Sequence, residues 1–112
     1  NEYLFEARPD DYFERIMDGA EADVTVCGHT HLPYHKVLPS GRHIINAGSV
    51  GKPKDHDPRA GYIAVTVNGR DVTVDFIRVA YDIERTAQAI ESTPEEGGMP
   101  HHFARLLREG AG

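Results

Sequence analysis

Two histidines separated by one residue are the strongest candidates in this chain for a metal-binding or catalytic site. They are His29 and His31, and they follow Gly28 and the apolar run Val24–Cys27. A short, β-branched apolar run is typical of a buried strand, so both imidazoles would lie just beyond a strand end. Along an extended chain, residues two apart point to the same side, so the two rings can converge on one small volume. The spacing therefore predicts a pair of metal ligands.

Other interpretations of the same residues remain open. Two histidines in a polar loop can be surface groups that hydrogen-bond to solvent or to the main chain. Cys27 has the same parity as the histidines, so a zinc site of one cysteine and two histidines would define a lone zinc-binding module. Against that module, a thiol at the end of a buried strand is more often a small core residue.

Predicted helices and strands on both sides of the two histidines would position them. Before the pair, Pro9 and the two acids after it open a helix that Gly19 closes. After the pair, Tyr34–Leu38 and His43–Ala47 flank a turn at 39–42, which predicts a β-hairpin. The pair therefore sits in a loop between a buried strand and a hairpin.

The rest of the chain predicts a second hairpin and two helices. Tyr62–Val67 and Val72–Val79 flank the turn signal at 68–71, and their alternation suits a sheet covered on one face. Asp82 is a plausible cap for a helix over Ile83–Glu91, and a last helix runs over His102–Arg108. The polar loop at 48–61 is long enough that function is a common reason for such a segment.

The composition is that of a globular domain or a part of one. The chain has 112 residues, of which 39% are hydrophobic and 27% charged. We expect no membrane partner, because no apolar run approaches the ~20 residues that span a bilayer. No signal-peptide pattern opens the chain and its single cysteine can form no internal disulfide, so the expected location is cytoplasmic.

The charge balance bears on the partner. The chain carries 12 Lys and Arg against 18 Asp and Glu, a formal net charge of −6. Such a chain has no basic footprint for a nucleic-acid backbone, so nucleic acid is not the expected partner. A phosphate-bearing substrate would need a local positive charge, which a metal ion supplies.

Two motifs together carry a family resemblance. The run Gly-His-Thr-His-Leu-Pro at 28–33, followed by Ile-Ile-Asn-Ala-Gly-Ser-Val-Gly-Lys-Pro at 44–53, resembles the C-terminal part of a calcineurin-like metallophosphoesterase. The likeness is greatest to the compact bacterial and archaeal phosphodiesterase branch, which the runs at 57–62 and 81–84 also resemble. The resemblance implies an α/β fold, the C-terminal half of a four-layer α/β/β/α sandwich, with mostly β hairpins flanked by helices. Residues 1–112 would then be the C-terminal part of a single domain whose N-terminal metal-binding part is absent.

The resemblance also implies a reaction. In that family two divalent metal ions activate a water to hydrolyse a phosphodiester or a phosphomonoester. By this likeness His29 would ligate one ion and His31 the other, and the metals could be Mn, Zn, Fe or Ni. The family's other ligands have no counterpart in this chain, so the isolated chain is expected to be inactive. Its implied partners are the missing N-terminal part and a small-molecule phosphate ester.

Four residues near the pair are candidates to support a ligand or to contact substrate. They are Gly28, Asn46, Gly48 and Ser49, and the alternative for them is a turn that needs glycine and a capping asparagine. Charges in the long loop could face a substrate phosphate or could simply be solvated: Lys52, Lys54 and Arg59. The remaining histidines of the loop and the last helix are not expected to form a site: His56, His101 and His102.

A rival function uses the same fold without catalysis. The chain could be a protein-binding scaffold, although a scaffold has no reason to keep both imidazoles of the motif. A strand-rich chain that lacks half of its sheet should also expose an apolar edge. A homo-oligomer is therefore compatible with the sequence.

Overall fold

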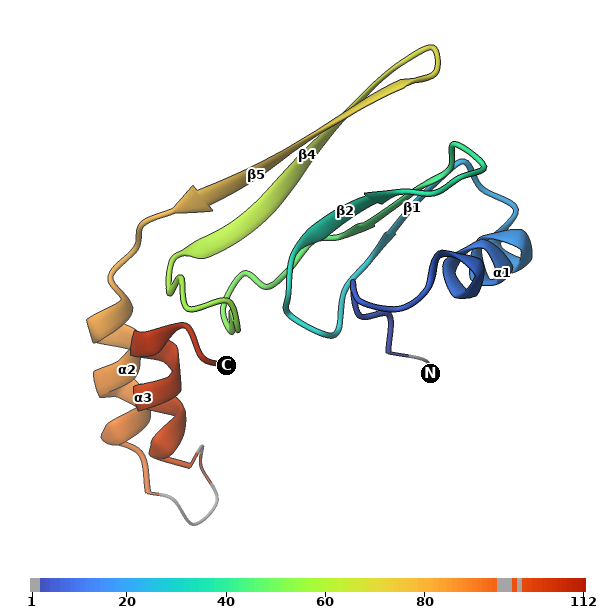
Figure 1. The fold of residues 1–112 in the computed structure, drawn as a ribbon. Coiled ribbons are helices and arrows are strands. Elements are labelled where there is room, and N and C mark those ends of the chain that lie inside the picture. The colour runs from blue at the N-terminus through green and yellow to red at the C-terminus, as the bar shows by residue number, and fades with distance from the viewer. Residues whose placement is uncertain (1–2, 95–97, 99) are drawn as a thin grey trace.

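The structure is a computed structural model that describes residues 3–94, 98 and 100–112, so most of the predicted loop at 95–100 lies outside the described residues. The elements follow in the order helix, three short strands, two long strands and two helices (Figure 1). Their bounds are α1 (Asp10–Ala20), β1 (Val24–Cys27), β2 (Tyr34–Val37), β3 (His43–Asn46), β4 (Ala60–Asn68), β5 (Asp71–Val79), α2 (Ile83–Glu91) and α3 (His102–Glu109).

A three-stranded sheet carries the histidine loop. Its strand order is β1-β3-β2, with β1 parallel and β2 antiparallel to β3. The register pairs Cys27 at the end of β1 with Asn46 at the end of β3. The loop after β1 therefore leaves the sheet beside the end of β3, although the two segments are far apart in sequence.

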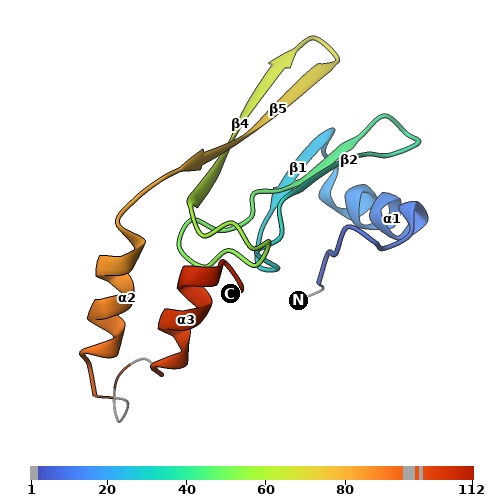
Figure 2. The same cartoon turned by 60° about the vertical axis from the view of Figure 1, so that its left-hand side comes forward.

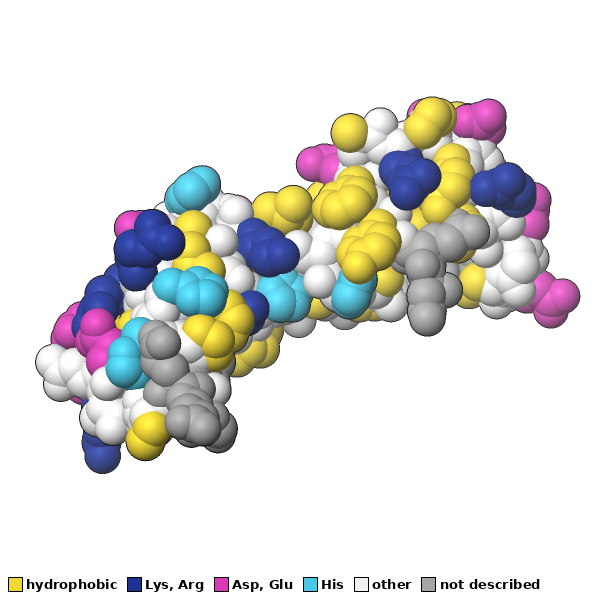
Figure 3. Space-filling view, turned by 90° about the horizontal axis from the view of Figure 1, so that it is seen from below, with side chains coloured by type: hydrophobic (Ala, Val, Ile, Leu, Met, Phe, Trp, Pro, Cys, Tyr) yellow, Lys and Arg dark blue, Asp and Glu magenta, His cyan; other side chains and the backbone are white. Residues whose placement is uncertain are grey.

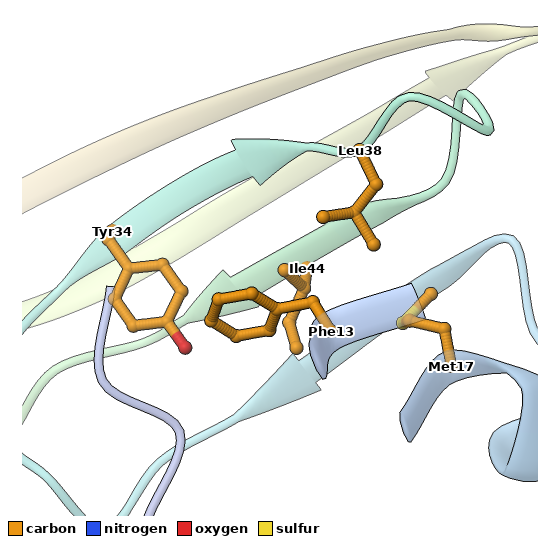
Figure 4. Close-up of a cluster of buried hydrophobic side chains, with 5 residues drawn as sticks. All are labelled: Phe13, Met17, Tyr34, Leu38 and Ile44. Carbon is orange, nitrogen blue, oxygen red and sulfur yellow. The ribbon is translucent and has the colours of Figure 1, made fainter. Parts of the chain in front are cut away.

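Helix α1 covers one face of this sheet. Phe13 and Met17 of the helix are fully buried (Figure 4). They pack against Tyr34 of β2, Leu38 in the turn after β2 and Ile44 of β3. Full burial of such side chains stabilises each by about 1.5–3 kcal/mol, so this cluster fixes the sheet on the helix.

The end of α1 differs from the prediction. Gly19 stays helical, and Glu21 makes the C-terminal cap with a left-handed φ of 52°. Its backbone N–H donates to the Met17 carbonyl at 3.0 Å, which closes the last turn. The helix continues past the glycine because the buried Met17 lies in that turn and holds it on the sheet.

Strands β4 and β5 form a long hairpin on the side of the sheet away from α1 (Figures 1 and 2). The register places six apolar side chains on one face: Ile63, Val65, Val67, Val72, Val74 and Phe76. The prediction of a covered face is only partly met, because Val67 is 60% exposed and Phe76 is 43% exposed. Nothing in the described residues covers the outer part of this hairpin face.

Helices α2 and α3 pack on each other at the far end of the molecule (Figure 2). Helix α2 has the predicted bounds, and the Asp82 carboxylate accepts from the backbone N–H of Arg85 at 3.1 Å, as an N-cap does. Ala87, Ala104 and Leu107 form their buried contact. Gly110 takes the predicted C-cap position with a left-handed φ of 65°.

The architecture confirms the α/β class, with small sheets flanked by helices. The four-layer order stays a prediction. The radius of gyration is 16.8 Å, against about 13 Å for a compact domain of this length, so the chain is elongated. None of the described helices combines the length and apolar character that a membrane span requires.

Candidate metal site

The backbone of the histidine loop is strained at the histidines themselves. His29 has a φ of 77° and His31 a φ of 62°, both in the left-handed region. Histidine visits this region more readily than most residues, but two such positions so close together are uncommon. Gly28 has no left-handed φ, and a Cβ there would meet nothing within 4 Å. The expectation of an extended segment was therefore wrong at the histidines, and the strain is of the kind that gathers at functional sites.

Asn46 holds this loop in place. Its side chain is fully buried, and its amide nitrogen donates to the Thr30 hydroxyl at 3.0 Å and to the Gly28 carbonyl at 3.3 Å. Its amide oxygen accepts from the backbone N–H of Gly48 at 2.9 Å. One side chain at the end of β3 thus binds both the histidine loop and the start of the long loop.

A main-chain carbonyl orients His31. Its Nδ1 donates to the Lys52 carbonyl at 2.8 Å, and the Ser49 hydroxyl accepts from the Lys52 N–H at 2.8 Å, which fixes the turn that presents this carbonyl. A neutral imidazole that donates from Nδ1 keeps a lone pair on Nε2. Metal-ligating histidines are held by such a hydrogen bond on the other nitrogen.

His29 has a different environment. Its ring lies 4.7 Å from the Tyr3 ring at an interplanar angle of 48°, and the residue is exposed. The loop therefore presents one oriented and one accessible imidazole.

Gly48 is a glycine for a steric reason. Its φ is 74°, and a Cβ there would lie 3.2 Å from the Cβ of Pro33. The two ends of the site, the proline after the histidine loop and the start of the long loop, approach each other only because this side chain is absent.

The candidate phosphate-facing cations have other contacts. The Lys52 ammonium lies 4.4 Å from the centre of the Phe103 ring on α3. Arg59 pairs with Asp57 at 2.8 Å and lowers the pKa of that carboxyl to about 2. The side chain of Lys54 lies against Gly112. These contacts favour the interpretation of the three residues as structural or solvated loop charges.

The remaining candidates keep structural environments. The Cys27 thiol lies 4.0 Å from the Tyr34 hydroxyl, and burial raises its pKa, so it is a protonated core group. The backbone N–H of His56 donates to the Gly110 carbonyl at 2.9 Å. His101 Nε2 donates to the Thr93 carbonyl at 2.6 Å, and the His102 ring packs edge-on to Phe103.

The described part of the chain does not hold a complete metal site. Within it, no three or more His, Cys, Asp or Glu residues gather so that they could bind one ion. The chemistry of His31, with an oriented ring and a free Nε2, fits a ligand of a site whose other ligands lie elsewhere. The Lys52 carbonyl could not be predicted from the sequence, because a main-chain acceptor is independent of residue type.

A cavity lies between the histidine loop and the segment before α1. Its volume is about 380 Å³, and its walls include Thr30, Leu32 and Pro33 of the loop with Phe5 and Glu6 of the N-terminal segment. The segment before α1 is therefore part of the surroundings of the site.

Comparisons with known proteins agree with this fold. No family model matches the chain. A metallophosphoesterase structure from Sphaerobacter thermophilus is 29% identical with a TM-score of 0.69, and the match covers 98% of this chain and 51% of that one. A hypothetical protein from Pyrococcus horikoshii, 22% identical with a TM-score of 0.73, shares the fold over 98% of this chain and 41% of its own.

This chain also covers less than half of a curated relative. An uncharacterized protein of Methanocaldococcus jannaschii is 30% identical over an alignment 103 positions long, which covers 80% of this chain and 39% of that protein. The chain thus spans about half or less of the length of the proteins that it matches.

Proposed function

Because the chain belongs to the calcineurin-like metallophosphoesterase superfamily, we propose that it supplies two metal-ligating histidines, His29 and His31, to a hydrolase of phosphate esters. The substrate is a phosphodiester or a phosphomonoester of small size. The chain spans only part of its relatives, so the activity is proposed for the complete domain and not for these 112 residues alone.

The orientation of His31 is the observation that carries this proposal. Its Nδ1 donates to the Lys52 carbonyl, so Nε2 is the nitrogen that the ring can offer to a metal ion. The left-handed backbone at both histidines is a second support, because such strain persists only where surrounding contacts enforce it. Asn46 supplies those contacts.

The residues of this chain then have distinct tasks. His29 and His31 would hold two divalent ions, one each, with Mn, Zn, Fe or Ni as candidates. When bound, such ions activate water and bind the phosphoryl oxygens. Asn46, Gly48 and Ser49 position the loops, and Gly28 contributes its carbonyl to the amide of Asn46. We assign them positioning rather than substrate contact.

The proposed partner is the amino-terminal part of the same domain. Within the described residues β1 pairs with β3 alone, so its other edge has free backbone groups. Val26 on β1 is 52% exposed, as is expected for a strand that another segment covers. Pairing with a further strand at this edge would bring the remaining metal ligands to the end of β1, where the histidine loop begins.

The test uses the complete protein and measures hydrolysis of bis(p-nitrophenyl) phosphate with added Mn²⁺. His29→Ala and His31→Ala should each reduce activity by more than the roughly 10–100-fold that loss of an outer partner of a ligand costs. The matched control is His102→Ala on α3, which should retain activity. Full activity in the double variant of His29 and His31 would refute the proposal.

A scaffold on the same fold is the alternative, and the same measurement addresses it. A scaffold would show no metal-dependent hydrolysis in the unmodified protein. The location that we propose, the cytoplasm, rests on the single cysteine, because a chain with one thiol gains nothing from an oxidising compartment.

A further inference from the structure

A second pair of histidines, which we call the strand pair, lies on the three-stranded sheet. His35 of β2 and His43 of β3 have the opposite parity to Tyr34 and Ile44, which face α1. Because side chains alternate along a strand, the strand pair lies on the other face. His35 Nε2 and His43 Nδ1 are 2.9 Å apart, and the rings stack with centroids 5.1 Å apart at 26°.

The separation of the two nitrogens suits a bidentate metal site. In octahedral or square-planar coordination, two imidazole nitrogens that bind one ion at about 2.0–2.1 Å lie about 2.9 Å apart, and in tetrahedral coordination they lie about 3.3 Å apart. Rotation of the two rings would therefore let an ion replace the hydrogen bond between them. Both rings come from paired strands of one hairpin, so the two ligands are already held close together.

The surroundings leave His43 open to a cavity and keep His35 unprotonated. A cavity of about 320 Å³ reaches His43, with Asp23, Arg42 and Arg70 as its charged walls. Arg42 pairs with Glu14 at 3.0 Å and with Asp18 at 2.8 Å, which offsets its repulsion of a cation. Burial, together with the neighbouring His43, lowers the pKa of His35, so this ring is unprotonated at neutral pH.

We propose that the strand pair chelates one transition-metal ion of the borderline class, Zn²⁺, Ni²⁺ or Cu²⁺, separately from the histidines of the loop. Imidazole nitrogen suits these ions, whereas Mg²⁺ and Ca²⁺ require oxygen ligands and Mn²⁺ binds nitrogen more weakly. The bound ion would link β2 to β3, with its β3 ligand His43 at the start of that strand and Asn46 at the other end. This site is independent of the proposed hydrolase function, since it uses neither of the loop histidines.

The experiment isolates the strand pair in the 112-residue chain. In a background with His29→Ala and His31→Ala, calorimetric titration with Ni²⁺ should show one bound ion per chain and no binding of Mg²⁺. Adding His35→Gln or His43→Gln should weaken Ni²⁺ binding by at least about tenfold, the scale on which metal sites respond to the loss of a supporting group. The matched control removes two other histidines, His56→Asn and His102→Gln, and should leave binding unchanged.

A measurement on the unmutated side chains guards against variants that fail to fold. The ¹⁵N resonances of His35 Nε2 and His43 Nδ1 should shift together when Zn²⁺ is added to the loop-histidine background. Ring resonances that do not respond, or Ni²⁺ binding that survives both glutamine substitutions, would overturn the proposal. A weakening of binding by the His56 and His102 control would do the same.

Discussion

The two histidine pairs are held in place in opposite ways. The loop pair, His29 and His31, sits on left-handed backbone, and its rings have separate neighbours, Tyr3 for one and the Lys52 carbonyl for the other. The strand pair, His35 and His43, sits on regular paired strands, and its rings bond to each other. The rings of the first pair are therefore held separately, whereas those of the second are held against each other.

The two pairs therefore depend on different contacts in their surroundings. Paired strands fix the strand pair through their own backbone hydrogen bonds. The loop pair has no such frame, so it depends on side chains from elsewhere, Asn46 above all. The loop pair should therefore be sensitive to changes outside the loop, and the strand pair should not.

The largest expected effect follows the loss of Asn46. Asn46→Ala leaves the Thr30 hydroxyl and the Gly28 carbonyl without their partner and frees the Gly48 N–H. An unsatisfied group costs about 1–3 kcal/mol where it is buried, as Thr30 is, and less where water reaches it, as at Gly28 and Gly48, so we expect the free energy of unfolding in urea to fall by about 3 kcal/mol. Ring resonances of the loop pair should shift, while those of the strand pair stay in place.

The exposed asparagine of the second hairpin is the control for that variant. Asn68→Ala should change the free energy of unfolding by no more than about 0.5 kcal/mol. If the ring resonances of both histidine pairs shifted equally in Asn46→Ala, the two pairs would not differ in their dependence on Asn46.

A smaller effect separates two glycines, one beside each pair. Gly41 lies in the turn between β2 and β3 and has a φ of 87° with nothing near its Cβ position. Gly48 has a similar φ of 74° and the close contact with Pro33. We expect Gly41→Ala to cost about 1 kcal/mol from backbone strain alone. Gly48→Ala should cost about 1–2 kcal/mol more, because the methyl group also overpacks the proline. Equal losses in thermal or urea unfolding would show that the loop contact is unimportant.

The smallest effect is a pH dependence of the strand pair. The pKa of His35 is lowered in the folded chain by burial and by His43, so the unfolded chain binds a proton more readily. The free energy of unfolding should therefore be fully maintained above the unfolded pKa of about 6.5 and should fall as the pH drops below it. His35→Gln should reduce this dependence, and His102→Gln should not.

Carboxylates contribute at lower pH and can be told apart from this effect. Ser40 lowers the pKa of Glu14, and Arg108 lowers those of Glu84 and Glu91. Their stabilisation is lost only as the pH falls toward those lowered values. A stability that stays constant from neutral pH to the onset of carboxylate protonation would contradict the role given to His35.

Local signals explain which elements the sequence predicted well. The bounds of α2 and its Asp82 cap follow from side chains within one turn of the helix end. The strand Val24–Cys27 and the hairpin around the turn at 39–42 likewise depend on neighbouring residues. The metal and substrate roles of the loop residues stay predictions, because the described residues do not gather enough ligands to bind an ion.

Tertiary contacts explain what the sequence did not predict. Helix α1 passes Gly19 because Met17 is buried under the sheet, and the histidine loop is left-handed because Asn46 holds it. The strand pair required a register: His35 opposes Ile45 and Val37 opposes His43. In this register the two histidines are two positions apart on facing strands, so their side chains lie on the same face of the hairpin.

Lys52 joins two parts of the molecule through its two ends. Its carbonyl accepts from His31, and its ammonium lies on the Phe103 ring of α3. The chain has no tryptophan. A Phe103→Trp chain would therefore carry a single indole in contact with the residue that orients His31, and its fluorescence would provide an optical signal for events at the histidine loop.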